Sequence, residues 1–293
     1  MSYCDWSITI QGERHPFGEV QVAGWEIAGR DYRTDDTDRP RADGRYVGQD
    51  FSTPGDIEVD LLIRAPGKTN QEKFDNAWAL REEFGRVWNG DAIRFTPGLV
   101  AELEVAGKAV VEGRPRSLDW DDSKAKFGII KGNAVFVRTN EEVYAAGTGT
   151  QSVTVGLVPA QQGGLIAPLV APLTTSRSSS RAAPFDVGGD ATVWPVISLH
   201  GPINPGAEIE LLFNWTVKIN RGLKYDEVAV LDTRPGRRAM TLNGQPVNLI
   251  DPTGARLTQL SVPPGTHSLA LRGTSLEGTA YVTLEWREGK KAL

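Results

Sequence analysis

The chain has 293 residues, of which 40% are hydrophobic and 24% are charged, as is ordinary for a globular protein with a substantial core. The net charge of −5 and the isoelectric point of about 5.4 argue against binding to nucleic acid through clustered Lys and Arg. The length favours two domains over a single large one.

Cys4 is the only cysteine, so neither an intramolecular disulfide nor a cysteine-based zinc site can form. No basic and then apolar leader opens the sequence, and no apolar run approaches the roughly 18–20 residues that span a bilayer. We therefore expect a protein that is made in a reducing cytoplasm and does not insert into a membrane.

Apolar and polar residues alternate in residues 6–10, 20–27 and 57–63, which predicts strands of a half-buried sheet. Residues 30–46, RDYRTDDTDRPRADGRY, are highly charged and contain almost no apolar anchor. This composition predicts a long loop that extends from the body of the protein. The loop is either mobile or an arm that becomes ordered against a neighbouring subunit.

A helix is predicted at residues 70–89. Thr69 and Glu72 fit a capping box at its start, and Asn89-Gly90 fits a left-handed cap at its end. Apolar residues recur between them at helical spacing, so we expect one face to be buried against a sheet. That face carries three large aromatic side chains: Phe74, Trp78 and Trp88.

Further strands are expected at residues 92–96, 101–112, 116–120 and 126–137, completing a first domain at residues 1–150. Residues 161–184 are rich in Gly, Pro, Ser and Ala, which is typical of a linker. We expect a connecting segment at residues 151–185, although residues 152–158 also fit one more strand.

About eight short strands are expected beyond residue 186, and together they predict an all-β sandwich at residues 186–293. Asn243-Gly244 is a strong signal for a two-residue hairpin within it. The expected strands are residues 193–199, 208–214, 216–219, 227–232, 238–242, 257–262, 267–272 and 279–287.

The sequence offers no recognisable set of catalytic or metal-binding residues. His15, His200 and His267 are far apart, and no second ligand lies at metal-binding spacing from any of them. HExxH, GxSxG and Walker-type glycine motifs are absent from the sequence. We expect no catalytic residues, no cofactor, no metal and no enzymatic activity.

Carbohydrate binding is a second hypothesis for the sandwich. The aromatic faces of Trp194 and Trp215 suit the apolar faces of pyranose rings, and Tyr225 could add an exposed contact. The sequence also allows Trp194 and Trp215 to be core residues of the sandwich, and it favours this interpretation.

Five segments carry a resemblance to a known family. The more specific ones are GGLIAPLVAPL at 163–173, WPVISLHGPINP at 194–205 and LDTRPGRRAMTLNG at 231–244. Weaker support comes from AYVTLEWR at 280–287 and GRPRSLDWDDSKAKFG at 113–128. In these segments the chain resembles the distal tail proteins (Dit-like minor tail proteins) of long-tailed siphophages, especially those of phages of actinobacteria.

The resemblance implies a mainly β protein: a tail-tube-like N-terminal β-sandwich or barrel with one packed helix, followed by a galectin-like β-sandwich. It also implies a structural virion protein at the distal end of the phage tail. Six copies would form a ring that joins the tail tube to the tail tip or baseplate hub proteins. Genomic DNA would pass through the central channel without specific binding.

Under this interpretation the charged loop becomes a candidate for the ring interface or the channel. The candidate residues are Asp31, Arg33, Asp35, Asp36, Asp38, Arg39 and Arg41. Two alternatives remain: a carbohydrate-binding accessory protein that attaches to host cell-wall glycans, and a cell-wall hydrolase.

Overall fold

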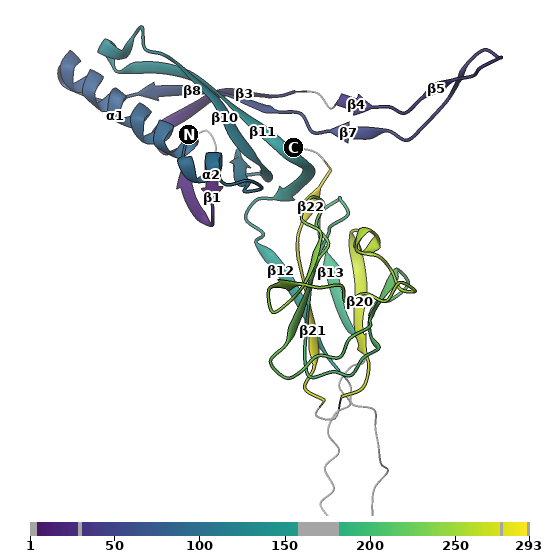
Figure 1. Ribbon diagram of the computed structural model, residues 1–293. Coiled ribbons are helices and arrows are strands. Elements are labelled where there is room, and N and C mark those ends of the chain that lie inside the picture. Colours follow the sequence, from purple (N-terminus) through teal and green to yellow (C-terminus); the bar gives the residue numbers. More distant parts are fainter. Residues whose placement is uncertain (1–4, 29–30, 158–181, 276–277, 292–293) are drawn as a thin grey trace, which may run out of the picture. The chain divides into compact units, whose positions relative to one another are not determined.

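The computed structural model describes residues 5–28, 31–157, 182–275 and 278–291 (Figure 1). The chain divides into two compact units. Unit 1 comprises residues 1–147 and 290–293, and unit 2 comprises residues 148–289. The sequence of unit 2 is therefore inserted near the C-terminal end of the sequence of unit 1.

Unit 1 is built on an eight-stranded sheet, in which the order is β2-β1-β9-β10-β11-β8-β3 and the short β22 pairs with β11. Strand β8 shows why one face of this sheet is buried, because its alternate residues from Ile57 to Ile63 are all shielded from solvent. The strands are β1 (Ser7–Ile10), β2 (Glu13–Pro16), β3 (Val20–Ile27), β8 (Ile57–Arg64), β9 (Ala101–Val105), β10 (Ala109–Asp121), β11 (Ile129–Ala145) and β22 (Gly289–Lys290).

The long helix α1 (Asn70–Trp88) packs on the buried face of this sheet (Figure 1). At its start the hydroxyl of Thr69 accepts a hydrogen bond from the Glu72 N–H at 3.1 Å. In return, the Glu72 carboxylate accepts one from the Thr69 N–H at 3.3 Å. The predicted capping box and helix are thus confirmed. The left-handed cap expected at Asn89-Gly90 is wrong, because φ is −94° at Asn89 and −53° at Gly90.

Aromatic rings form much of the contact between α1 and the sheet. Phe84 and Trp88 stack with centroids 5.6 Å apart, and Phe17 meets Phe84 edge-on at 5.0 Å. Of the three aromatics expected to be buried, only Trp88 is fully buried. Phe74 and Trp78 stack on each other and stay half-buried, and the Trp78 indole N–H donates to Glu82 on the same helix.

The strands between residues 101 and 145 are divided differently from the prediction. The strand expected at residues 101–112 is interrupted by a turn at Ala106-Gly107, which joins β9 to β10. Both turn residues have positive φ (54° and 61°). Strand β10 then continues through the expected strand at residues 116–120. The short 3-10 helix η1 (Ala125–Phe127) precedes β11, which therefore begins later than expected.

The strand expected at residues 92–96 is also wrong, because Asp91–Phe95 form the short helix α2. This helix buries Ile93. The guanidinium of Arg114 donates to the carbonyls of Ile93 and Thr96, at 2.7 and 2.5 Å. Carbonyls at a helix end lack partners within the helix, so a distant residue stabilises this structure where the local sequence suggests a strand.

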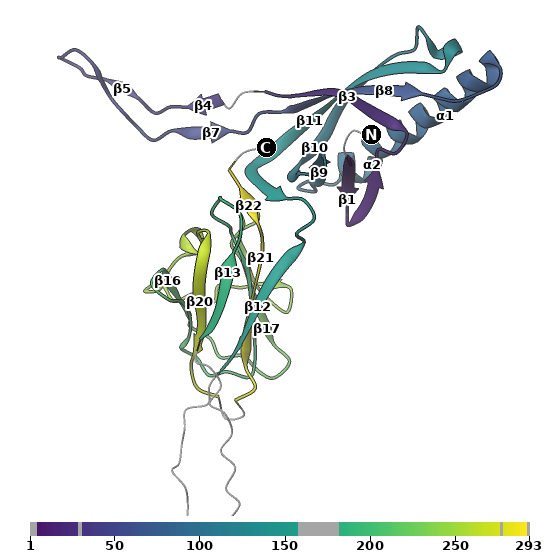
Figure 2. The same ribbon diagram turned by 180° about the vertical axis from the view of Figure 1, so that it is seen from behind.

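Unit 2 is a sandwich of two antiparallel sheets around one hydrophobic core (Figure 2). The predicted mainly β fold, with a C-terminal sandwich, is therefore confirmed. The six-stranded sheet has the order β12 (Thr150–Gly156), β21 (Tyr281–Arg287), β14 (Val196–His200), β17 (Val228–Asp232), β18 (Ala239–Leu242) and β19 (Gln245–Pro246). The four-stranded sheet has the order β13 (Ala183–Val187), β20 (Gly265–Arg272), β15 (Ala207–Leu211) and β16 (Trp215–Ile219).

The predicted hairpin at Asn243-Gly244 is confirmed, since both residues have positive φ and Leu242 pairs with Gln245. The strand expected at residues 257–262 is wrong. Its first half is the 3-10 helix η2 (Leu257–Gln259), in which the Gln259 side chain accepts from the Arg256 N–H and closes a turn.

The expected connecting segment at residues 151–185 begins and ends within strands. Strand β12 pairs with β21, and β13 pairs with β20. Residues 158–181, which include the apolar GGLIAPLVAPL stretch, lie outside the described residues.

His200 and Tyr281 lie opposite each other on β14 and β21, and their rings stack with centroids 4.2 Å apart. Burial lowers the pKa of His200 below its ordinary value, because a partly desolvated imidazole is harder to charge. Folding therefore favours the uncharged imidazole of His200 over its protonated form, relative to the unfolded chain.

Removing the helix cap should destabilise unit 1. We expect Thr69→Ala to lower the free energy of unfolding by about 1 kcal/mol, because the Glu72 N–H loses its acceptor. Urea denaturation followed by circular dichroism measures this loss. Thr69→Ser keeps a hydroxyl at the cap and should stay close to the parent. Equal loss in both variants would contradict the role of the cap.

The pKa of His200 predicts a pH dependence of stability. The unfolded chain takes up a proton near the ordinary histidine pKa of about 6.5, whereas folded His200 does so only at lower pH. Stability should therefore fall as the pH drops below neutrality. In His200→Phe, which keeps a stacking ring without a titrating group, thermal unfolding at pH 7.5 and 5.5 should differ less than in the parent. An unchanged difference would contradict this.

Candidate assembly interface

The charged segment that the sequence predicts as a loop is a two-stranded ribbon, here called the arm (residues 31–53). Its strands are β4 (Asp31–Arg33), β5 (Thr37–Asp38), β6 (Arg45–Tyr46) and β7 (Phe51–Thr53). Strand β4 pairs with β7, and β5 pairs with β6. In Figure 1 the ribbon reaches away from the strands of unit 1 that it joins, β3 and β8.

The arm carries apolar side chains that it cannot bury. Tyr32, Tyr46, Val47 and Phe51 are all exposed, and Val47 keeps 83% of its surface. Arg39 lies over the ring of Tyr46 at 5.4 Å, and Arg33 lies over the ring of Phe51 at 5.2 Å. An isolated two-stranded ribbon is marginally stable in water, and exposed apolar groups on it indicate a contact surface.

The residues predicted for the ring interface all lie on this arm, where several of them bond within the ribbon. Asp38 pairs with Arg45 at 2.9 Å across β5 and β6. Asp36 accepts from the Gly48 N–H at 3.0 Å. The side chain of Asp31 is outside the described part of the structure. Arg33, Asp35 and Arg41 are exposed along the arm, as is Arg39.

Sequence reasoning missed the apolar residues of the arm. Tyr32 and Tyr46 stand inside the segment that was interpreted as lacking apolar anchors, and Val47 follows directly. Tyr32 pairs with Ser52 and Thr37 pairs with Tyr46 across the ribbon. The aromatic residues near both ends of the segment, Tyr32 and Phe51, are the sequence signal that could have revealed a ribbon, since they fall on its two paired strands β4 and β7.

The two end strands of the sheet in unit 1 offer further assembly surface. Strands β2 and β3 each have a partner on one side only within the described sheet. Trp25, on β3, is 44% exposed and meets Trp6 edge-on at 6.0 Å. Unpaired strand edges pair readily with another chain, and an exposed tryptophan beside one adds apolar contact area.

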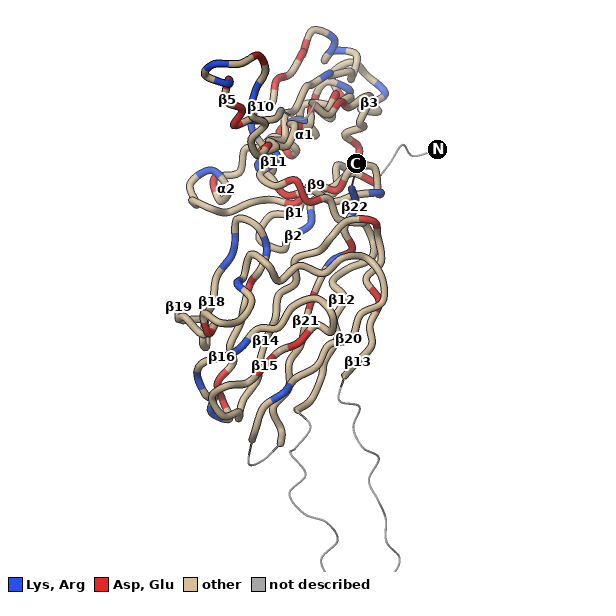
Figure 3. Tube along the Cα trace, turned by 90° about the vertical axis from the view of Figure 1, so that its right-hand side faces the viewer, with Lys and Arg blue, Asp and Glu red and all other residues tan. Residues whose placement is uncertain are grey.

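The face of the sheet opposite α1 carries three carboxylates along β3 and β8, with Arg64 at the end of β8 on the same face. Glu26 and Glu58 lie directly opposite each other on these strands, and Asp60 follows two residues along. All three are exposed, and the Asp and Glu positions of unit 1 are coloured red along the chain trace in Figure 3. Like charges placed opposite each other cost stability, so Glu26 and Glu58 are an unfavourable pair within unit 1.

Glu104, on β9, lies on the same face of the sheet and forms an ion pair with Arg14 at 2.8 Å. Burial alone raises the pKa of Glu104, but hydrogen bonds from Arg14 and Ser7, both at 2.8 Å, outweigh it and lower the pKa. The group is therefore ionised at neutral pH.

The histidines lie in separate strands, with His15 in β2, His200 in β14 and His267 in β20. Within the described ranges, no three His, Cys, Asp or Glu side chains are grouped closely enough to hold a metal ion. None of the helices in those ranges has the length and apolar character needed to cross a bilayer.

The residues predicted for glycan contact are not brought together by any contact in the described structure. Trp215 lies on β16 in the four-stranded sheet and is 6% exposed, as expected for a core residue. Trp194 precedes β14 of the other sheet and is half-buried, with the Arg238 guanidinium 5.0 Å from its ring centroid. Tyr225 is 75% exposed on the loop between β16 and β17.

No protein-family model and no curated protein sequence matches this chain. Solved structures match it over almost its full length. One is the crystal structure of Dit (gp 19.1) of phage SPP1, described as a paradigm of the hub adsorption apparatus in phages that infect Gram-positive bacteria. It shares 12% identity with the chain, at a TM-score of 0.58, covering 97% of this chain and 98% of that one.

Two further matches are to the baseplate of phage P2 in its activated conformation, one with Ca and one with Sr. Their TM-scores are 0.51 and 0.52, each at 12% identity, and both cover 96% of this chain and 97% of the matched chain. At 12% identity, such structural matches establish the fold alone. The resemblance predicted from the sequence is therefore confirmed as a shared fold: over both of its units, the chain is folded like the Dit hub protein.

Proposed function

We propose that this chain is a structural virion protein, the distal tail hub of a long-tailed bacteriophage. Six copies form a ring that joins the tail tube to the tail tip or baseplate proteins, and the virion carries this ring at the distal end of its tail. The observation that carries the proposal is the match to phage SPP1 Dit, which extends over 97% of this chain and both of its units.

The arm supports assembly into a ring. A closed ring needs a heterologous contact, in which one surface of a subunit meets a different surface of its neighbour. The arm provides one of these two surfaces, because its apolar side chains are exposed. The unpaired edges of β2 and β3 provide candidates for the surface on the neighbour that the arm contacts.

The charged residues of the arm set the specificity of that contact. Three acidic residues, Asp35, Asp36 and Asp38, are followed by the basic Arg39 and Arg41, so a neighbour must present positive and negative charges in a matching order. In this proposal these residues lie at the ring interface together with Asp31 and Arg33.

The acidic sheet face supports a channel for DNA. A lumen lined by carboxylates repels phosphate, so a genome can slide through without binding. Glu26, Glu58 and Asp60 form such a surface on β3 and β8. This function requires no catalysis, no cofactor and no membrane insertion.

The mass of the purified protein in solution tests the ring. We expect light scattering to give six times the chain mass of 31.8 kDa. The double variant Tyr46→Asp/Val47→Asp should give monomers, because both side chains are exposed on the arm and charge on them opposes burial at an interface. Tyr225→Asp, at another exposed aromatic, should leave the mass unchanged.

A monomeric parent protein would contradict the proposed ring. A ring that persists in the double variant would contradict the role of the arm. The circular dichroism spectrum of the variant should match that of the parent, because neither side chain belongs to the core.

Charge reversal tests the channel. We expect Glu58→Lys/Asp60→Lys to permit ring assembly and to slow DNA release from virions that carry it, because Lys attracts phosphate. Asp75→Lys/Glu82→Lys makes the same change in charge on α1 and should release DNA at the parent rate. Equal release from both variants would contradict the placement of this face in the channel.

A further inference from the structure

An apolar pocket, here called the α1 pocket, lies in unit 1 between the second half of α1 and the first strands of the sheet. Its volume is about 380 Å³, within the range of binding sites. Leu80, Phe84 and Val87 line it from the helix, and Ile8, Pro16 and Phe17 line it from β1, β2 and the loop that follows. Leu80 and Val87 are only half-buried, so the pocket presents apolar surface to solvent.

Carboxylates border this apolar surface. Glu19, on the loop between β2 and β3, and Glu83, on α1, both belong to the α1 pocket and are exposed. Among the described residues, neither carboxylate has an ion-pair partner. A partner that combines an apolar anchor with positive charge therefore fits this pocket best.

The outer end of the arm has this combination. Tyr46 and Val47 are exposed, and the guanidinium of Arg39 lies over the ring of Tyr46. The turn at residues 39–44, RPRADG, holds two arginines and one aspartate, so it is net positive. In the described part of the chain, neither Arg39 nor Arg41 has a carboxylate partner. Tyrosine and arginine are among the residues that most often dominate the free energy of binding at protein interfaces.

Strand β3 separates the arm from the α1 pocket of its own chain. Val20, the first residue of β3, lines the pocket, whereas the arm lies beyond the last residue, Ile27. An extended strand of this length spans roughly 25 Å. In Figure 1 the arm continues away from α1. A second copy of the chain must therefore supply the pocket that an arm enters.

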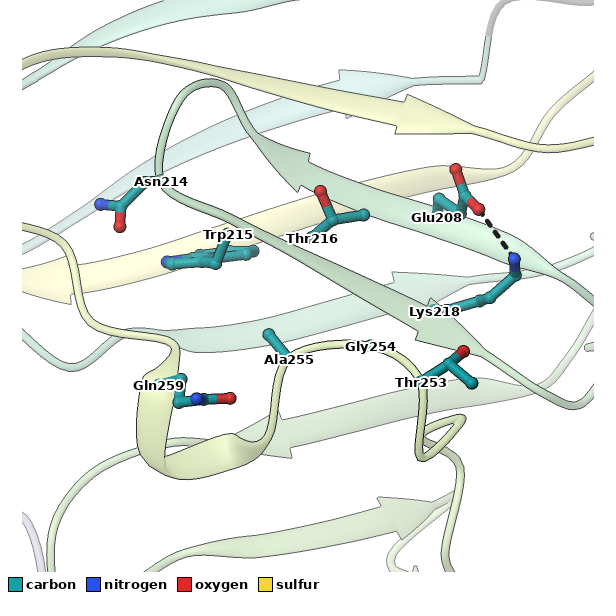
Figure 4. Close-up of a pocket in the computed structure, with 9 residues that line it drawn as sticks. All are labelled: Glu208, Asn214, Trp215, Thr216, Lys218, Thr253, Gly254, Ala255 and Gln259. Atoms are coloured by element: carbon teal, nitrogen blue, oxygen red, sulfur yellow. Dashed lines mark ion pairs between the residues drawn. The ribbon is translucent and has the colours of Figure 1, made fainter.

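The pocket beside β16 in unit 2 does not fit the arm. Most of the side chains drawn around it in Figure 4 are polar, so it offers an aromatic anchor little apolar surface. The carboxylate among the residues that line it, Glu208, is already paired with Lys218 at 3.1 Å. The α1 pocket is therefore the better partner in both shape of lining and charge.

We propose that the outer end of each arm docks in the α1 pocket of the next copy of this chain. Tyr46 and Val47 enter as apolar anchors, and the arginines of the turn face the two carboxylates of the pocket. The inference rests on the ring proposed above and names the surface of the neighbour that the arm contacts. Each copy donates one arm and receives another, so the contact is heterologous and can close a ring.

Disulfide crosslinking of the full-length protein tests the docking. In a Cys4→Ser background, Val47→Cys and Leu80→Cys place one thiol on the arm and one in the pocket. After mild oxidation, we expect electrophoresis under denaturing, non-reducing conditions to show a ladder of linked chains of up to six copies. The matched control replaces Leu80→Cys by Ala79→Cys, at an exposed position on α1 outside the pocket, and should give no such ladder.

A charge exchange tests the same contact through the dissociation of the ring. We expect Glu83→Arg to raise at least tenfold the protein concentration at which half of the rings are dissociated, because it places positive charge against the turn of the arm. Adding Arg39→Glu should restore most of this loss. Asp75→Arg, at another exposed carboxylate of α1, should match the parent. Mass photometry over a dilution series measures all four proteins.

A crosslinking variant that has the hexameric mass under reducing conditions and yet gives no ladder would overturn the docking and leave the hub function standing. A ladder from Val47→Cys with Trp25→Cys in its place would put the arm at the β3 edge and would also overturn it. Unchanged dissociation in Glu83→Arg would contradict the charge contact. A monomeric parent protein would contradict the ring itself, so failure of the hub function is distinguishable from failure of the docking.

Discussion

The packing of a single helix on one face of the eight-stranded sheet is the constraint on which the rest of unit 1 depends. The rings of Phe17, Phe84 and Trp88 fill the space between α1 and the strands and determine which side of each strand is buried. Because side chains alternate along a strand, burying Ile57 and Val59 places Glu58 and Asp60 on the opposite face. The acidic surface is thus a direct consequence of the position of the helix.

The same packing leaves the assembly surfaces uncovered. Helix α1 buries one sheet face but reaches neither the apolar side chains of the arm nor the exposed Trp25 on β3. Burial of these apolar side chains against another chain is favourable. Ring formation would therefore stabilise the folded state by mass action. Unit 2 has a hydrophobic core of its own, made of other residues than the core of unit 1.

The sequence predicted those elements that local interactions specify. The capping box at Thr69 and the Asn243-Gly244 turn each involve residues a few positions apart, so both could be recognised directly. Helix α2 depends on Arg114, and the ribbon depends on pairs such as Tyr32 with Ser52. These contacts form only in the folded chain, which explains why a strand and a loop were expected instead.

Electron cryomicroscopy of virions that carry this protein tests the central claim most directly. The account predicts density for six copies, related by rotation about the tail axis, in a ring between the end of the tail tube and the tail tip. The arm of each copy should contact its neighbour. A different rotational symmetry, a single copy, or density elsewhere in the particle would contradict the account.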